Sequence, residues 1–197
     1  MMRFDNEIIG HWIKPESRVL DLGCGDGSLL KNLSDSKSIR GYGLEIDPDG
    51  IQSCVEKGLN IIEKNLDEGL SDFDDDSFDM VIMSQALQTM HYPQKILSEM
   101  VRIGRECIVT IPNFGHWRTR FHLMFMGRMP ISERLPYEWY NTPNIHFCTF
   151  KDFNILCEEM SLKVIDRLVV SGRAEASFLN KVNPNLFGET GIFRLSK

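Results

Sequence analysis

Residues 19–27 read V-L-D-L-G-C-G-D-G, and this stretch decides how the rest of the chain is interpreted. Its apolar opening predicts a strand, and three alternate glycines, Gly23, Gly25 and Gly27, separate that strand from a helix predicted at 26–33. Glycine suits such a turn because any Cβ atom would hold a ligand away from the backbone amides. The glycine triplet alone is weak evidence for a ligand site, since a purely structural turn can have the same composition.

Short β-rich runs alternate with helical patterns through the first 110 residues, which predicts parallel strands joined by right-handed crossovers. We predict strands at 18–22, 41–46, 60–64, 78–84, 107–111, 162–170 and 191–196. We predict helices at 26–33, 47–58, 93–102 and 151–160. The last two strands have no predicted helix between them, so we expect an antiparallel hairpin at the sheet edge. The expected fold is a doubly wound, Rossmann-like α/β sheet of seven mostly parallel strands in a single domain, 1–197.

Residues 113–146 interrupt this alternation with seven of the 19 aromatic residues and four arginines. This insert could be a lid in which Arg118 or Arg120 binds a substrate carboxylate, an interface with Trp, Tyr and Arg anchors, or a small separate core. One helix face in it is apolar and consists of Trp117, Phe121, Met124 and Phe125. We expect part of this cluster to be core, although the same face would also suit a protein partner.

The formal charge of −6 over 197 residues is concentrated in one segment, Asn65 to Asp79, which has seven acids and no base. We interpret it as a solvated acidic loop, and the rest of the chain has no basic stripe for nucleic acid. No apolar window is long enough for a membrane span, and no signal peptide is apparent. The five cysteines are scattered, without a C-x-x-C pair. A cytoplasmic protein without a disulfide framework or a zinc site is expected.

The spacing around the glycines favours one cofactor class over another. Dinucleotide folds use G-x-G-x-x-G, whereas this chain has G-x-G-x-G with Asp21 two residues earlier. A carboxylate at that point suits a ligand with an ammonium group better than a diphosphate. Glu45 ends the second predicted strand, where a carboxylate can accept both hydroxyl protons of a ribose; a solvated strand-end acid is the alternative. A nicotinamide-dependent dehydrogenase is disfavoured by the glycine spacing and by the final hairpin.

An acid, G-x-G-x-G and a second acid in this order resemble the class I S-adenosylmethionine-dependent methyltransferases. Longer strings across residues 4–170 are similar to one family, the methionine biosynthesis protein MetW. These strings are Asp67-Glu68-Gly69-Leu70, Ser77-Phe78-Asp79 leading to Ser84-Gln85-Ala86-Leu87-Gln88, Pro112-Asn113-Phe114-Gly115-His116-Trp117-Arg118, and Trp139-Tyr140-Asn141-Thr142-Pro143-Asn144-Ile145-His146. The resemblance implies the class I methyltransferase fold and S-adenosylmethionine or S-adenosylhomocysteine as the ligand.

The resemblance also implies roles for the residues at the first two strand ends. Asp21 would face the methionyl amino group, and Glu45 would bind the ribose hydroxyls. Ile46 would pack on the face of the adenine. The backbone that lines the methionyl part would come from Gly23, Cys24, Gly25 and Gly27.

Four further positions follow the third and fourth strands. Ser84 and Gln85 would flank the sulfonium, and Asn65 and Leu66 would lie beside the adenine. Asn65 departs from the family pattern, which has an acid there to accept the adenine amino hydrogens. Its amide oxygen can still accept a hydrogen bond, but without charge assistance. Weaker or altered cofactor binding is therefore expected.

The sequence does not predict a catalytic residue. The tetrad of amino methyltransferases is absent after the fourth strand, where Ser84 to Leu87 stand instead. His91 lies near the rim of the expected pocket, but a capping or solvated histidine is the more common case. His116 and His146 flank the insert and could converge. No spacing of histidines or carboxylates predicts a metal site.

The resemblance implies a partner as well, because the MetW family is associated with the homoserine O-acyltransferase of methionine synthesis. We therefore expect an accessory subunit for which bound adenosylmethionine serves as an end-product signal. The alternative is a catalytically active methyltransferase that acts on a small carboxylate or hydroxyl acceptor. The fold alone does not separate these two functions.

Overall fold

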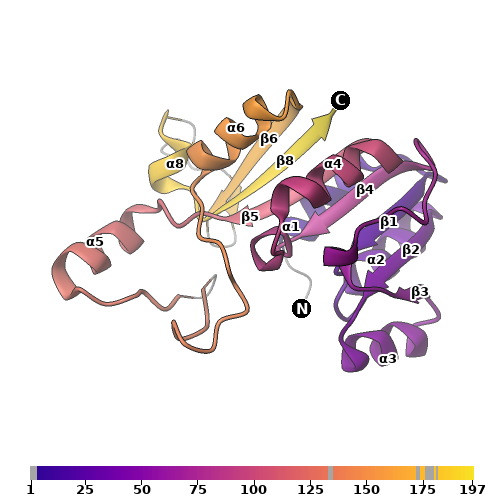
Figure 1. Ribbon diagram of the computed structural model, residues 1–197, viewed down its shortest axis with the longest axis horizontal. Helices are drawn as coiled ribbons and strands as arrows, with labels where there is room; N and C mark the ends of the chain where they lie inside the picture. Colours follow the sequence, from indigo (N-terminus) through magenta and orange to yellow (C-terminus); the bar gives the residue numbers. More distant parts are fainter. Residues whose placement is uncertain (1–3, 133–134, 172–173, 176–179, 181) are drawn as a thin grey trace.

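The computed structural model describes residues 4–132, 135–171, 174–175, 180 and 182–197 (Figure 1). Within these residues one sheet contains eight strands in the order β3-β2-β1-β4-β5-β8-β6-β7. The strands are β1 (Arg18–Leu22), β2 (Arg40–Glu45), β3 (Asn60–Glu63), β4 (Phe78–Ser84), β5 (Gly104–Pro112), β6 (Lys163–Ser171), β7 (Ala174–Glu175) and β8 (Thr190–Ser196). The first five pair in parallel. This confirms the predicted doubly wound α/β fold, with the two-residue β7 added beyond the seven predicted strands.

The predicted antiparallel pairing of the last two long strands, β6 and β8, is confirmed, and only the two-residue β7 lies beyond them at that end of the sheet. β8 lies between β5 and β6 and pairs antiparallel with both, so it is an interior strand and not an edge. Its first four residues, Thr190 to Phe193, are all buried, whereas the first six residues of β6 are exposed. β8 is therefore covered on both faces, as an interior strand is, although β6 contains more apolar residues. A short helix, α8 (Pro184–Phe187), also lies between β6 and β8, where none was predicted.

The helices are α1 (Phe4–Trp12), α2 (Ser28–Lys37), α3 (Pro48–Glu56), α4 (Pro93–Ile103), α5 (Trp117–Met126) and α6 (Phe150–Glu159), with 3-10 turns η1 (Leu66–Glu68) and η2 (Leu87–Thr89). Helices other than α5 cover both faces of the sheet (Figure 1). Side chains of α1 and α2 pack in one apolar cluster with Val19 and Ile82. Side chains of α4 and α6 pack in a second cluster with Leu20 and Val81. Successive strand residues thus enter opposite cores, as a two-sided sheet requires.

The acidic segment 65–79 is largely exposed, as expected, but four of its seven acids form ion pairs with Lys or Arg. Asp72 and Asp75 have most of their side-chain surface in solvent, yet each bonds to a cation. The ion pairs are Lys64 with Asp72, Arg102 with Asp75, Lys197 with Asp76, and Arg105 with Asp79. Arg102 also donates to the backbone oxygens of Leu70 and Phe73. Arg102 therefore ties this loop to the end of α4, and the other three cations come from β5 and from the residues that follow β3 and β8.

The expectation that the apolar face of the insert is partly core is wrong. α5 projects away from the sheet (Figure 1), and Thr119 is its one buried residue. The four apolar residues of that face, Trp117, Phe121, Met124 and Phe125, are all exposed. Helical periodicity identified the face correctly, but it did not identify what covers it.

The described part of the chain contains no helix that is long and apolar enough to cross a membrane.

Candidate cofactor site

The loop between β1 and α2 has a backbone that requires glycine. Gly23, Gly25 and Gly27 have φ angles of 67°, 56° and 72°, which lie in the left-handed region. A Cβ atom on Gly27 would come within 2.6 Å of Leu59 and Cys54, so this glycine is needed for packing. A Cβ atom on Gly25 would meet no atom within 4 Å. Gly25 therefore faces open space, as expected of a position under a ligand.

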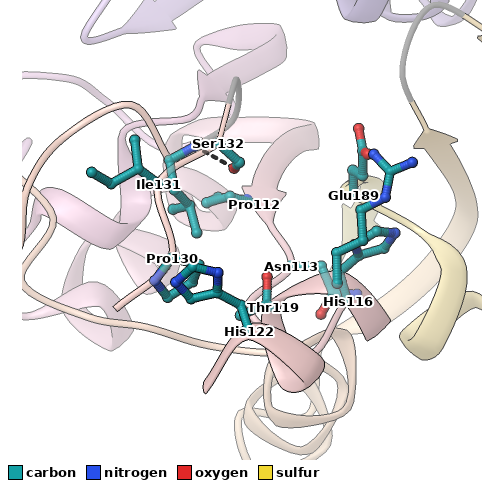
Figure 2. Close-up of a pocket in the computed structure, with 11 residues that line it drawn as sticks. Pro112, Asn113, His116, Thr119, His122, Pro130, Ile131, Ser132 and Glu189 are labelled. Carbon is teal, nitrogen blue, oxygen red and sulfur yellow. Dashed lines mark hydrogen bonds between the residues drawn. The ribbon is translucent and has the colours of Figure 1, made fainter. Parts of the chain in front are cut away.

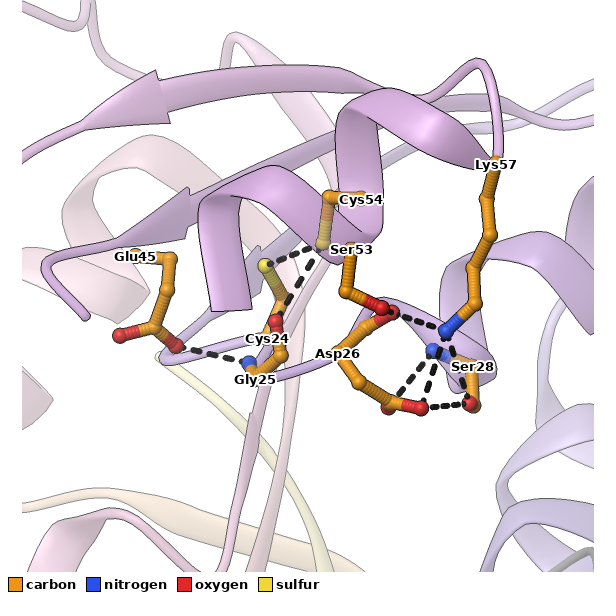
Figure 3. Close-up of polar contacts among 8 residues, drawn as sticks. All are labelled: Cys24, Gly25, Asp26, Ser28, Glu45, Ser53, Cys54 and Lys57. Carbon is orange, nitrogen blue, oxygen red and sulfur yellow. Dashed lines mark hydrogen bonds and ion pairs between the residues drawn. The ribbon is translucent and has the colours of Figure 1, made fainter. Parts of the chain in front are cut away.

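Glu45 anchors this loop from the end of β2 (Figure 3). One oxygen of its buried carboxylate accepts a 2.7 Å hydrogen bond from the backbone N–H of Gly25. The other accepts from the N–H groups of Ile46 at 2.7 Å and Asp47 at 2.9 Å. These charge-assisted bonds fix the loop relative to β2. They leave the oxygen that bonds to Gly25 with capacity for a second donor such as a ribose hydroxyl.

Asp21 lies beneath the loop in β1 and is only 2% exposed. Burial, with a smaller contribution from the charge of Glu45, raises the pKa of Asp21 to about 7. Its Oδ1 atom has no hydrogen-bond partner among the described residues. A buried oxygen without a donor is costly, and an ammonium group on a ligand would supply both the donor and the compensating charge. This position therefore fits the predicted ligand.

Two free thiols meet on the other side of the loop. The Sγ atoms of Cys24 and Cys54 are 3.9 Å apart, and the Cys54 thiol also donates to the backbone oxygen of Gly25 at 3.3 Å. Burial is the main cause that raises the pKa of both thiols. Cys54 belongs to α3, which thus packs against the loop, and nothing in the sequence indicated this contact.

The end of the loop is fixed by Asp26 (Figure 3). Its carboxylate accepts from the backbone N–H and hydroxyl of Ser28 and from Lys57 Nζ at 2.9 Å. The hydrogen bonds from Ser28, followed by those from Lys57, lower the pKa of Asp26 to about 2. Lys57 follows α3, so this contact joins the first turn of α2 to the end of the next helix.

The other predicted residues surround the same edge of the sheet. Ile46 is 56% exposed directly after β2, so its side chain is accessible. Ser84 ends β4, and its hydroxyl lies 3.3 Å from that of Thr110 on β5. Thr110 also accepts a 2.9 Å bond from the backbone N–H of Gln85, whose φ is 55°. The ends of β4 and β5 are thereby held together beside the loop.

Asn65 and Leu66 follow β3, as predicted, but their side chains already have structural contacts. The Asn65 amide oxygen accepts a 3.1 Å bond from the backbone N–H of Asp67 and so caps η1. Leu66 is buried, and its Cδ1 atom would lie 4.0 Å from a Cβ on Gly23. Leu66 therefore reaches the glycine loop, whereas Asn65 must share its oxygen between the cap and any adenine amino group.

The histidines have different environments. His91 bonds to both oxygens of Asp67, through its backbone N–H at 2.9 Å and its Nδ1 at 2.7 Å. Burial works against ionisation of Asp67, but the bonds from His91 outweigh it and lower the pKa of that carboxyl. His146 is exposed, and its backbone N–H bonds to the carbonyl of Gln88. His91 thus has a structural partner, in agreement with the more common case expected for it.

His116 is buried beside a cleft of about 440 Å³ at the end of β5 (Figure 2). The cleft is lined by Pro112, Asn113, His116, Arg118, Thr119, His122, Pro130, Ile131, Ser132, Leu135 and Glu189. Burial lowers the pKa of His116, which favours its neutral form. His146 is not part of this lining, so the cleft does not bring the two histidines together. No cluster suited to a metal ion occurs among the described residues.

Comparison with known proteins agrees with the kind of protein that the site suggests. The sequence profile of "Methionine biosynthesis protein MetW" matches residues 3–195. The chain belongs to the MetW family. A relative from Rhodopirellula baltica, "Bifunctional methionine biosynthesis protein MetXA/MetW", is 33% identical over 201 residues. The alignment covers 97% of this chain but 32% of the relative, so the chain spans about a third of that protein's length. The relative therefore contains a MetW-like part within a longer chain.

Solved structures show the fold of this MetW chain. An S-adenosylmethionine-dependent methyltransferase from Mesorhizobium loti aligns with a TM-score of 0.72 at 13% identity, over 99% of this chain and 98% of that one. The [4+2]-cyclase SpnF aligns with a TM-score of 0.69 at 15% identity, over 98% and 80% of the two chains. The fold is thus that of class I methyltransferases, and proteins with different named activities share it.

Proposed function

We propose that this MetW chain binds S-adenosylmethionine at the glycine loop and acts as an accessory subunit of the homoserine O-acyltransferase of methionine synthesis. Bound adenosylmethionine would report the level of the pathway's end product to the acyltransferase. The observation that carries the ligand assignment is the buried Asp21 oxygen without a donor, next to a glycine backbone open to ligand.

The ligand assignment is supported by the charges that surround the loop. Asp21 would bind the ammonium group, and Glu45 would accept a ribose hydroxyl while it holds Gly25 in place. Ile46 offers an exposed apolar surface for the adenine. When bound, adenosylmethionine supplies an electrophilic methyl group; this chain's residues bind and orient it.

The partner is supported by the Rhodopirellula baltica relative, whose name joins MetXA and MetW in one bifunctional protein. We take the MetXA part to be the acyltransferase. Two activities in one chain stay at high local concentration, which favours pairs that also work together when separate. The cytoplasm is the proposed compartment, because all five cysteines are free, including two thiols 3.9 Å apart.

The proposal is tested with the purified chain and the acyltransferase of the same organism. Titration calorimetry should show binding of adenosylmethionine and adenosylhomocysteine but not of NAD. The acyltransferase should co-purify with the chain, and its acylation rate should change when adenosylmethionine is added. A stable complex whose rate is indifferent to the ligand would contradict the signalling role.

A catalytic methyltransferase is the second candidate, and the cleft at the end of β5 favours it. This cleft lies at the same strand ends as the loop and combines the cationic Arg118 with the neutral His116 and the acidic Glu189. Such a lining suits a small acceptor with a carboxylate or hydroxyl group. Transfer of a labelled methyl group to a small molecule in cell extract, lost in an Arg118→Gln variant, would support this function.

A further inference from the structure

An exposed apolar surface lies on α5 and on the segment that returns from it. We define the arm surface as Phe121, Met124, Phe125, Met126, Trp139 and Tyr140. Each exposes between 51% and 70% of its surface. A cleft of about 830 Å³ joins the two segments, because Met126, Trp139 and Tyr140 all line it. The other three residues, Phe121, Met124 and Phe125, belong to the same helix as Met126, so the arm surface combines α5 with the segment that returns beside it.

A helix in this environment needs cover. α5 has ten residues and buries one of them, and isolated helices shorter than about 12–15 residues are marginal in water. The rings of Phe121 and Phe125 stack at 5.7 Å in solvent, which adds a specific but small contact. Tertiary packing normally supplies the stability of such a helix. Among the described residues α5 has little such packing, so its apolar side chains need a second surface to cover them.

The arm surface is large enough to bind a folded protein. Aromatic side chains present 150–250 Å² each when fully exposed, so the six residues together expose roughly 700 Å². A standard protein interface buries about 800 Å² on each partner, whereas an ordinary monomer exposes apolar patches of roughly 300–600 Å². Phe, Trp, Tyr and Met are also the residues enriched at interface cores.

Charge indicates which kind of protein fits. Residues 117–147 contain four arginines and two glutamates, a formal charge of +2, whereas the whole chain has −6. Arg118, Arg120 and Arg128 are exposed around the apolar residues. A second copy docked arm to arm would oppose these arginines to each other, which is unfavourable. A different protein with an apolar patch and an acidic rim is complementary.

We propose that the arm surface is the docking site for the homoserine O-acyltransferase, in an interface with an apolar centre and an acidic rim on the acyltransferase side. This inference rests on the proposed function, because the bifunctional relative is the observation that names the occupant. The cofactor loop lies at the carboxyl ends of β1 and β2, and the insert follows β5 at the same edge of the sheet. A partner on the arm surface would therefore lie on the side of the sheet where the ligand binds.

The test uses the full chain and the acyltransferase of the same organism, mixed and analysed by titration calorimetry and by size exclusion with light scattering. The test variant is Phe121→Gln with Phe125→Gln, which keeps helix-forming residues but removes both rings. The matched control is Val55→Gln with Ile155→Gln, at two exposed apolar residues of α3 and α6. The thermal shift with adenosylmethionine verifies folding of each variant.

We expect the arm variant to weaken the complex at least about 30-fold, as removal of central aromatic anchors does, while the control stays within about twofold. Arg128→Glu should slow association and reduce its salt dependence. Equal affinity of the arm variant and the wild-type chain would overturn the inference and leave the proposed partnership intact. A chain that forms its own dimer, lost in the arm variant, would also overturn it. Failure of the wild-type chain to bind the acyltransferase would instead refute the proposed partnership.

Discussion

The carboxylate of Glu45 accepts a 2.7 Å hydrogen bond from the backbone N–H of Gly25, and this contact joins the end of β2 to the loop that follows β1. The same side chain thus has two possible roles, one toward the loop and one toward a ribose. A substitution at Glu45 removes both unless the experiment separates them.

The two roles of Glu45 are separated by comparing adenosylhomocysteine with its 2′,3′-dideoxyribose analogue. If Glu45 binds the hydroxyls, the wild-type chain should prefer the natural ligand at least about tenfold, since hydrogen bonds to charged groups contribute 1.5–3 kcal/mol. Glu45→Gln should lose this preference. Calorimetry of both ligands with both proteins gives four affinities, and these yield the coupling free energy between Glu45 and the hydroxyls. If Glu45→Gln weakens both ligands equally, Glu45 acts through the loop alone.

Gly25 and Gly58 provide a matched pair for the space above the loop. Both have positive φ, 56° and 72°, and a Cβ on either would meet no atom within 4 Å. Alanine at either position should cost about 1–2 kcal/mol of stability because of the left-handed backbone. Only Gly25→Ala should also abolish the adenosylmethionine thermal shift, because its Cβ would enter the ligand space. Retention of the shift in Gly25→Ala would place the ligand elsewhere.

The contrast between these glycines shows what the sequence could predict. Continuous apolar runs bounded by turn residues gave the bounds of β1 and β4 correctly, as Arg18–Leu22 and Phe78–Ser84. The positions of Asp21 and Glu45 at strand ends followed from those strands. The spacing could not distinguish Gly27, which is needed for packing against Cys54, from Gly25, which faces open space.

The remaining differences arise where a tertiary neighbour decides the outcome. The helix α1 was not predicted, although it buries Ile8 and Ile9 against the sheet. The periodicity of α5 identified an apolar face, but periodicity does not show whether the cover comes from the same chain. The interior place of β8 likewise depends on which strands pair with it, β5 on one side and β6 on the other. These are properties of packing that a local pattern does not contain.

The raised pKa of Asp21 predicts that ligand binding depends on pH. In the free protein Asp21 carries a proton below a pKa of about 7, and a ligand ammonium group favours the ionised form. The ionisation of Asp21 alone should therefore make adenosylmethionine bind about tenfold more tightly at pH 8 than at pH 6, with uptake of a proton by the buffer. Calorimetry in buffers of different ionisation enthalpy measures both quantities. In the Asp21→Asn variant, any remaining pH dependence of the affinity comes from titration of the ligand itself. If the variant and the wild-type chain have the same pH dependence, Asp21 does not bind the ammonium group.

The same carboxyl predicts that the ligand site reduces the stability of the free protein. The pKa of Asp21 is about 7 in the folded chain and 3.8 by its reference value, so between these values the native state retains a proton that the unfolded state has lost. The free energy of unfolding therefore falls as pH rises through this window, by about 4 kcal/mol. Asp21→Asn should be more stable than the wild-type chain at pH 8, with the difference nearly gone at pH 4, as measured by urea unfolding.

Asp26 provides a control of opposite sign for this measurement. The bonds from Ser28 and Lys57 lower the pKa of Asp26 to about 2, so this carboxylate stabilises the fold above its unfolded pKa, and the contribution is lost as pH falls toward 2. Asp26→Asn should therefore destabilise the chain at pH 8, by a small amount because the side chain is largely exposed and screened. Two loop carboxylates on either side of Gly23 would then have opposite effects on stability at the same pH. If Asp21→Asn is also destabilising at pH 8, the Asp21 oxygen has a donor in solution, and the site is not held ready for an ammonium group.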